Sequence, residues 1–264
     1  MQVPHAATKA LITGGTQGLG LAIAKQLLAD GCRAIVLASR DETNGAAVAK
    51  ELSKDGAHVK FVPVDMGDVD QVFAMVDAAN DVMGGVNALV NCAATCDRGS
   101  ILDTTPETWD RVMDVNARGA FFAIQRFAQL AIKAGHGGGI VNILSIVVHG
   151  GLPFLAPYAA SKAALLNITK NSANTLAAHK IRVNGINVGW MDTPGEDATQ
   201  RKWHGAGGDW LKVAEARMPF GQLVKPEHVA GQVGFFLGPL SGVVTGSTVD
   251  FDQQVVGVYP DTHD

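Results

Sequence analysis

The sequence predicts a single α/β domain built on a doubly wound parallel sheet. Short apolar runs alternate with longer segments in which apolar residues recur every three or four positions. Strands that alternate with helices in this way form a parallel sheet with helices on both faces. Right-handed crossovers then wind the sheet in two directions from its centre. The length of 264 residues fits one large domain, which we place over residues 1–264 because no repeat or linker divides the chain.

The N-terminal half contains four expected strands and three expected helices. The strands are runs of Val, Ile, Leu and Ala that end at glycine or polar residues. Gly31 ends the first helix, because glycine is favoured just beyond a helix C-terminus. We expect strands at residues 8–13, 33–38, 59–64 and 86–90, and helices at residues 21–28, 44–54 and 69–83.

The C-terminal half continues the alternation. Thr105 is a suitable N-cap and Pro106 suits the first turn of a long helix, which the glycines at 135–139 end. We expect helices at residues 106–134, 157–178 and 226–237, and strands at residues 140–145, 181–187 and 246–251.

A glycine-rich turn joins the first strand to the first helix. Glycines let the backbone approach a pyrophosphate, and the amides at a helix N-terminus attract its charge. A glycine cluster alone is often only a turn, but a strand before it and a helix after it are typical of a dinucleotide site. The turn contains Gly14, Thr16, Gln17, Gly18, Leu19 and Gly20.

The second strand ends at Ser39-Arg40, where a dinucleotide fold meets the adenosine ribose. An acidic residue there binds a free 2′-hydroxyl, whereas an arginine accommodates a 2′-phosphate. Arg40 therefore favours NADP(H), with NAD(H) as the alternative. In the alternative interpretation, Arg40 only begins a solvent-exposed helix.

Polar residues stand at the ends of the expected strands. Ligands of doubly wound sheets bind at the carboxyl ends of the strands, so these residues and the glycine turn are expected to share one crevice. They are Thr13, Ser39, Asp65, Asn91, Ser145 and Asn187.

Tyr158 and Lys162 stand four residues apart in a segment rich in alanine and leucine. In a helix this spacing puts both side chains on one face. An ammonium beside a phenol lowers the phenol pKa, which predicts a base that works near neutral pH. Ser145, at the end of a buried strand, can face the phenol. The alternative is a surface Tyr and Lys on an amphipathic helix.

Taken together, the motifs resemble the short-chain dehydrogenase/reductase family, whose members have a Rossmann fold, over nearly the whole chain. The matching pieces are Thr13-Gly14-x-x-x-Gly18-x-Gly20, Asn91-x-Ala93, Asn116, Ser145, Tyr158-x-x-x-Lys162 and residues 182–194.

The resemblance implies a role for each catalytic residue. Tyr158 exchanges a proton with the substrate, Lys162 lowers the Tyr158 pKa and binds the nicotinamide ribose, and Ser145 bonds the reacting oxygen. Asn116 holds a water that links Lys162 to solvent. Thr193 holds the carboxamide, and Asp65 and Met66 bracket the adenine. The remaining implied cofactor contacts are Gly14, Thr16, Gln17, Gly18, Leu19, Gly20, Ser39, Arg40, Asn91, Ala93, Val188, Gly189 and Met191.

Three departures from the family pattern are visible. The family's Asn-Asn-Ala-Gly motif is replaced at residues 91–94 by Asn91-Cys92-Ala93-Ala94. The family's Pro-Gly after the sixth strand is replaced by Val188-Gly189. Neither removes a reacting group. The family's Asp-Gly-Gly near the C-terminus is replaced by Asp252-Gln253-Gln254, so substrates of better-known members are not transferred.

Residues 194–218 are expected to form a lid over the substrate. Trp203 and Asp197 in this segment, with Trp190 before it, suit a polyhydroxylated ligand, because indoles stack on a sugar ring and carboxylates accept from its hydroxyls. The alternative is a helical cover with core tryptophans. His149, just after Ser145, is a further candidate. Residues 189–197 and 251–253 are also similar to bacterial aldose 1-dehydrogenases, including the L-rhamnose type.

Three functions follow as hypotheses. The first is oxidation of a sugar at its anomeric hydroxyl to a lactone. The second is reduction of a small ketone or 3-oxoacyl thioester with NADPH, which Arg40 favours. The third is a nucleotide-binding protein without catalysis, which the set Asn116, Ser145, Tyr158 and Lys162 argues against.

Composition excludes other classes of partner. The formal charge of −4 and the lack of a basic run argue against nucleic acid and against a membrane surface. We expect no signal peptide, no metal site, free thiols at Cys32, Cys92 and Cys96, and a cytoplasmic location. The resemblance implies a homotetramer with an interface formed by the helices at 106–134 and 157–178.

Overall fold

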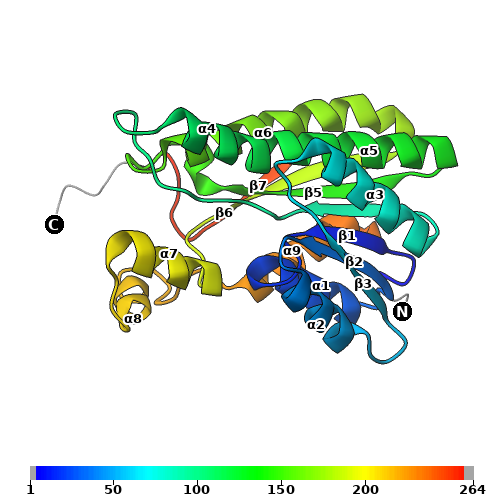
Figure 1. Ribbon diagram of the computed structural model, residues 1–264, viewed down its shortest axis with the longest axis horizontal. Coiled ribbons are helices and arrows are strands. Elements are labelled where there is room, and N and C mark those ends of the chain that lie inside the picture. The colour runs from blue at the N-terminus through cyan, green and yellow to red at the C-terminus, as the bar shows by residue number, and fades with distance from the viewer. Residues whose placement is uncertain (1–3, 259–264) are drawn as a thin grey trace.

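The computed structural model describes residues 4–258 and contains one seven-stranded parallel sheet in the order β3-β2-β1-β4-β5-β6-β7 (Figure 1). β1 and β4 are neighbours, so the order reverses between them, as predicted for a doubly wound sheet. The strands are β1 (Lys9–Thr13), β2 (Ala34–Ser39), β3 (His58–Pro63), β4 (Ala88–Asn91), β5 (Gly138–Ser145), β6 (Ile181–Val188) and β7 (Thr248–Phe251).

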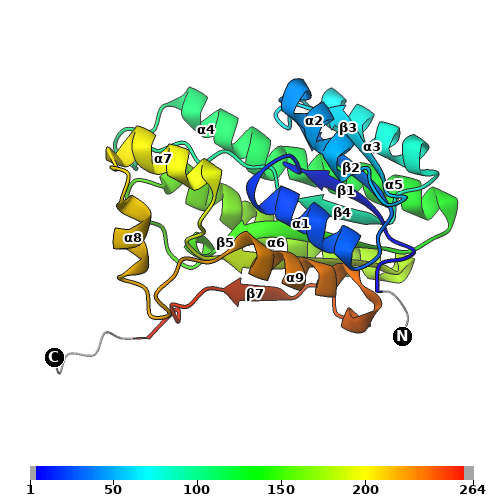
Figure 2. The same cartoon turned by 90° about the horizontal axis from the view of Figure 1, so that it is seen from below.

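Helices cover both faces of the sheet. One face carries α1 (Gly18–Ala29), α2 (Glu42–Leu52) and α9 (Pro226–Leu237), which Figure 2 shows from below. The other carries α3 (Val69–Met83), α4 (Pro106–Met113), α5 (Gly119–Ala134) and α6 (Ala156–Leu176). The lid segment is formed by α7 (Pro194–His204) and α8 (Trp210–Glu215), which extend beyond the edge of the sheet (Figure 1).

The helix ends follow the sequence signals. Asp41, Asp68, Thr105 and Thr193 each accept a hydrogen bond from a backbone amide of the first turn. α1 ends at Ala29 with Asp30 as C-cap, and Gly31 follows with a φ of 94°, so this glycine ends the helix as predicted. The predicted helices at 69–83 and 226–237 have the observed bounds of α3 and α9, and the other predicted boundaries differ from the observed ones by a few residues.

Aliphatic residues of the strands form the core on both sides of the sheet. Ile12, Ile35 and Val90 pack toward α1 and α9, while Leu11 and Val36 pack toward α3 and α5. The alternation in β1 explains this, because successive side chains of a strand point to opposite faces. Burial of each such side chain contributes about 1.5–3 kcal/mol, so these contacts stabilise the sheet whose carboxyl edge positions the site.

The expected helix at 106–134 is interrupted by a π-helical turn, η1 (Asp114–Arg118). Gly119 follows it, and a Cβ at this position would lie 2.2 Å from the carbonyl oxygen of Met66. The close approach brings this helix against the loop after β3. Such turns are frequent at functional sites, and Asn116 lies within this one.

Within residues 4–258, none of the helices has the length and the apolar character needed to cross a membrane.

Candidate active site

A cavity of about 750 Å³ opens at the carboxyl edge of the sheet. The glycine turn after β1 lines one end, α6 lines the other, and α7 lies across it. The predicted crevice therefore exists.

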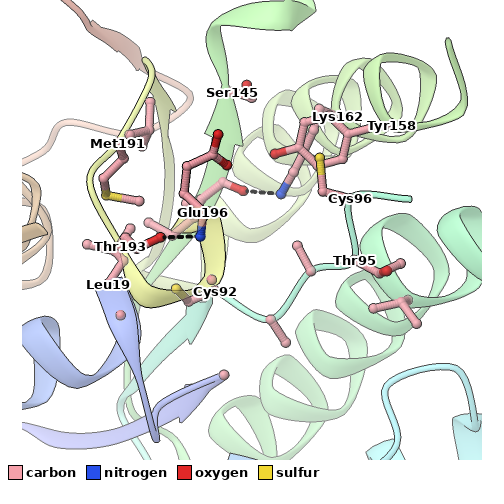
Figure 3. A pocket seen from close by; sticks show the side chains of 18 of the residues that line it. Leu19, Cys92, Thr95, Cys96, Ser145, Tyr158, Lys162, Met191, Thr193 and Glu196 are labelled. Carbon is pink, nitrogen blue, oxygen red and sulfur yellow. Dashed lines mark hydrogen bonds between the residues drawn. The ribbon is translucent and has the colours of Figure 1, made fainter. Parts of the chain in front are cut away.

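Ser145, Tyr158 and Lys162 meet at one end of this cavity, as predicted (Figure 3). Ser145 is the last residue of β5, and Tyr158 lies in the first turn of α6, where Pro157 also sits. Lys162 is one turn further along, with 2% of its surface exposed. Its Nζ donates to the carbonyl oxygen of Ile143 at 2.8 Å and lies 5.6 Å from the centroid of the Tyr158 ring.

The glycine turn has the shape of a phosphate cradle. Gly14 and Gly18 have φ angles of 67° and 50°, which favour glycine. A Cβ on Gly20 would lie 2.2 Å from the carbonyl oxygen of Gly14, and one on Gly14 would lie 2.9 Å from Cα of Ala93. Side chains at these two positions would clash with the protein's own backbone, so only glycine lets the turn pack this closely. The turn leads directly into the N-terminus of α1 at Gly18, where backbone amides are available to a pyrophosphate, so these residues fit a dinucleotide.

Most other predicted cofactor residues line the same cavity. They are Thr16, Gln17, Leu19, Ser39, Arg40, Asp65, Met66, Ala93, Val188, Gly189, Met191 and Thr193. Thr16 Oγ1 donates to Ser39 Oγ at 3.1 Å, which joins the turn to the end of β2. Asn91 is the exception, because it does not line the cavity, and its contact with the cofactor stays a prediction. Its side chain is 3% exposed and turns into the sheet, where Nδ2 donates to Asn142 Oδ1 at 2.8 Å.

Of the residues proposed for the substrate alone, Trp190 lines the cavity and the other three do not. His149 Nε2 lies 2.9 Å from Asp250 Oδ1, which ties the loop after β5 to β7. Asp197 accepts from Trp210 Nε1 at 2.7 Å and is paired with Arg201. The Lys202 ammonium lies over the Trp203 ring, 4.6 Å from the ring centroid. Each side chain is thus engaged elsewhere on the protein.

Known proteins share both sequence and fold with this chain. The family model described as Enoyl-(Acyl carrier protein) reductase matches residues 14–253. A solved structure described as a short chain dehydrogenase/reductase family protein is 32% identical, with a TM-score of 0.81 over 96% of this chain and 98% of that one. This chain belongs to the short-chain dehydrogenase/reductase family.

Several members of the family are similar over almost their full lengths. Galactitol 2-dehydrogenase of Agrobacterium fabrum is 33% identical over 252 residues, covering 92% of this chain and 95% of that protein. L-rhamnose-1-dehydrogenase of Scheffersomyces stipitis is 32% identical over 244 residues, covering 91% and 93%. A variant of actinorhodin polyketide ketoreductase, solved with NADPH, is 30% identical with a TM-score of 0.86, covering 95% and 98%. The chain is therefore a dehydrogenase/reductase that uses a nicotinamide cofactor.

Burial dominates the electrostatics of Tyr158 and Lys162 in this short-chain dehydrogenase/reductase. Burial raises the pKa of Tyr158, and the neighbouring Cys96 and Glu196 raise it further, while Ser145 and Arg98 lower it. Burial also lowers the pKa of Lys162 to about 8. Loss of hydration is the largest of these effects. Lys162 is not among the groups that shift the phenol pKa here, so the lowering expected from its charge stays a prediction.

Asn116 does not line the cavity and is 1% exposed. Its Nδ2 donates to Thr95 O at 2.9 Å and to Ser161 Oγ at 3.0 Å, and its Oδ1 accepts from Thr95 N at 2.8 Å. Both amide hydrogens are thus used in joining the loop after β4 to α6. These contacts position the loop next to Tyr158, and the water relay expected of Asn116 stays a prediction.

The cavity also contains residues outside the predicted site contacts, of which Glu196 and His204 belong to the polar residues of the expected lid. The loop after β4 supplies Cys96 and Arg98, and α7 supplies Glu196 and His204. Cys92 lines the cavity too, and burial raises the pKa of its thiol to about 12, so the thiol stays protonated at neutral pH. The sequence signal for Cys96 and Arg98 is their place shortly after a predicted strand end, because no motif marks either residue.

Proposed function

We propose that the protein transfers a hydride between NADP(H) and a hydroxyl-bearing carbon of a sugar or polyol. Oxidation of an anomeric hydroxyl would give a lactone. The observation that carries the proposal is the single cavity that joins the phosphate cradle to Ser145, Tyr158 and Lys162. Similarity to galactitol 2-dehydrogenase and L-rhamnose-1-dehydrogenase supports a polyhydroxylated substrate.

The proposed mechanism divides the reaction between the phenol and its neighbours. Tyr158 takes the hydroxyl proton of the substrate, while Ser145 holds the reacting oxygen by a hydrogen bond. A bound NADP⁺ would supply the acceptor for the hydride of the carbon that carries this hydroxyl. Lys162 is held by Ile143 O close to the phenol ring, so its charge favours the phenolate during the transfer.

The substrate end of the cavity has groups that suit hydroxyls. Glu196 Oε1 accepts from Trp190 Nε1 and from Gln200 Nε2, each at 2.7 Å. A carboxylate has about four acceptor positions on two oxygens, so Glu196 retains acceptors for a ligand. Trp190 also stacks on Trp210, with ring centroids 6.2 Å apart, which holds this wall of the cavity against α8.

NADP(H) is the proposed cofactor, because Arg40 lines the cavity next to Ser39 at the end of β2. The side chain is exposed and so available to a 2′-phosphate. NAD(H) is the alternative.

A second candidate is reduction of a small ketone or a 3-oxoacyl thioester with NADPH. Leu152 and Phe154 give one wall of the cavity an apolar surface, which suits an acyl chain. The similar ketoreductase supports this candidate as well. The non-catalytic hypothesis receives no support, because Ser145, Tyr158 and Lys162 lie together.

A homotetramer is proposed with α4, α5 and α6 at one interface. Trp109 of α4 and Phe121 and Ile132 of α5 are exposed apolar residues in this layer, and contact with a second copy would cover them.

Initial rates with aldoses, polyols and ketones, each with NADP(H) and NAD(H), test the proposal by nicotinamide absorbance. We expect oxidation of aldoses or polyols with NADP⁺. Turnover confined to ketones or 3-oxoacyl thioesters would select the second candidate.

A further inference from the structure

The substrate end of the cavity holds a cation that lacks a counter-charge. Arg98 lines the cavity beside Cys96, Phe154 and His204. Within residues 4–258, no carboxylate is in ion-pair contact with its guanidinium. The other cation of this wall, Arg111, is neutralised by Asp97 at 2.9 Å.

The guanidinium of Arg98 is held in place by neutral groups. Nη1 donates to Cys96 Sγ at 2.9 Å and to Cys96 O at 3.3 Å. Nη2 lies 3.2 Å from His204 Nε2, and since arginine can only donate, His204 must accept through Nε2 and carry its proton on Nδ1. The guanidinium also lies over the Phe154 ring, with Arg98 Cζ 5.4 Å from the ring centroid.

One donor of this group remains unused. Nε of Arg98 is buried and has no hydrogen-bond partner in the described part of the chain. A buried donor without a partner costs about 1–3 kcal/mol, and the cost is recovered if a ligand supplies an acceptor. Nε and Nη2 form one edge of the guanidinium, and this edge fits the two oxygens of a carboxylate.

We infer that Arg98 binds a carboxylate of the substrate, so that the substrate is a sugar acid, either a uronate or an aldonate. The inference rests on the proposed function and adds the charge of the substrate to it. The carboxylate lies at the Arg98 end, and the reacting hydroxyl lies at Tyr158. Binding through this edge would replace the Nη2 contact with His204 and supply Nε with an acceptor.

The charges of the cavity favour a monoanion over a phosphate ester. Glu196 lines the same end and carries a negative charge, while Lys162 is bound to Ile143 O beside the phenol. Arg98 and Lys162 together exceed Glu196 by one positive charge at neutral pH, and a monoanion balances that charge. A phosphate with nearly two charges would leave an unbalanced charge next to Glu196.

The test compares matched substrates in wild type and in three variants. The substrates are hexoses with the corresponding hexuronates, polyols with the corresponding aldonates, and hexose 6-phosphates. The variants are Arg98→Gln, Arg98→Lys and Lys202→Gln. The last removes one positive charge from α7 at a side chain that does not line the cavity. Initial rates give kcat/KM, and calorimetry with the NADPH-saturated enzyme gives affinities without turnover.

We expect wild type to prefer the acid over its neutral counterpart, and Arg98→Gln to lower that preference roughly tenfold to hundredfold, as a charge-assisted hydrogen bond predicts. Arg98→Lys keeps the charge but not the two-pronged edge, so it should retain part of the preference. Lys202→Gln should leave the ratio within about twofold. Thermal unfolding and NADPH affinity check that each variant is folded.

If wild type has the same kcat/KM and the same affinity for each acid and its neutral counterpart, the inference is wrong. The proposed oxidation of sugars would be unaffected by that result. Preference for the 6-phosphate over the hexuronate would also overturn the inference. Tight binding of the acid that Arg98→Gln abolishes, without any oxidation, would support the anion site and refute the proposed function.

Discussion

The charge of Lys162 can be tested through the pH dependence of Lys162→Met. Methionine keeps the length of the side chain and removes the ammonium. Nζ lies 5.6 Å from the Tyr158 ring centroid, and at an effective dielectric constant of about 20 a unit charge at this distance contributes about 3 kcal/mol. This corresponds to about two pKa units of Tyr158. We therefore expect kcat/KM for oxidation near neutral pH to fall about a hundredfold.

The sign of the pH effect follows from the pKa of Lys162, which burial lowers to about 8. Below this value the ammonium is charged and favours the phenolate. Above it, wild type loses the same charge that the variant lacks. The ratio of wild-type to variant kcat/KM should thus be largest below about pH 8 and narrow as the pH rises. The apparent pKa values of the pH profile describe Tyr158 and Lys162 as a coupled pair rather than either residue alone.

The assay is kcat/KM for alcohol oxidation over about pH 6 to 10, followed by nicotinamide absorbance. Lys170→Met is the matched control, because Lys170 is an exposed residue of the same helix that does not line the cavity. The reasoning is refuted if Lys162→Met lowers kcat/KM by the same factor at every pH. The residue would then act through its bond to Ile143 O rather than through its charge.

The remaining predictions concern the base, the cofactor and the loop. Tyr158→Phe should abolish turnover while NADPH still binds, as measured by fluorescence titration; activity close to wild type would remove the phenol from the mechanism. Arg40→Asp should lower the NADP/NAD ratio of kcat/KM values at least about tenfold, and an unchanged ratio would exclude a 2′-phosphate contact. Gly20→Ala should lower thermal stability by about 1–3 kcal/mol and weaken cofactor binding, since its Cβ would meet Gly14 O; unchanged dinucleotide affinity would contradict the cradle. Asn116→Leu leaves Thr95 and Ser161 without their partners and should cost about 2–4 kcal/mol in denaturant unfolding, so a variant as stable as wild type would show that the loop is held by other contacts.

The predictions for the fold were largely confirmed, and the misses are local. The helix at 69–83 was predicted to the residue, because its cap and its periodicity are both strong. The π-helical turn at 114–118 was missed, since it depends on the approach of Gly119 to Met66 rather than on the helical pattern itself.

The substrate end of the site was predicted less well than the cofactor end. Phosphate binding and the Tyr158-Lys162 pair depend on spacing within a turn or a helix, which the sequence contains. The charge around the substrate depends on pairs such as Arg98 and His204, which come from the loop after β4 and the end of α7. Asp197 and Trp203 have suitable chemistry, but their contacts lie outside the cavity.

The sequence by itself determined the fold class, the glycine cradle and the residues Ser145, Tyr158 and Lys162, because hydrophobic period and short-range spacing specify them. Only the tertiary structure decided the raised pKa of Tyr158, the positioning role of Asn116 and the unpaired charge of Arg98. These properties arise from burial and from contacts between distant segments, and both exist only after the chain has folded.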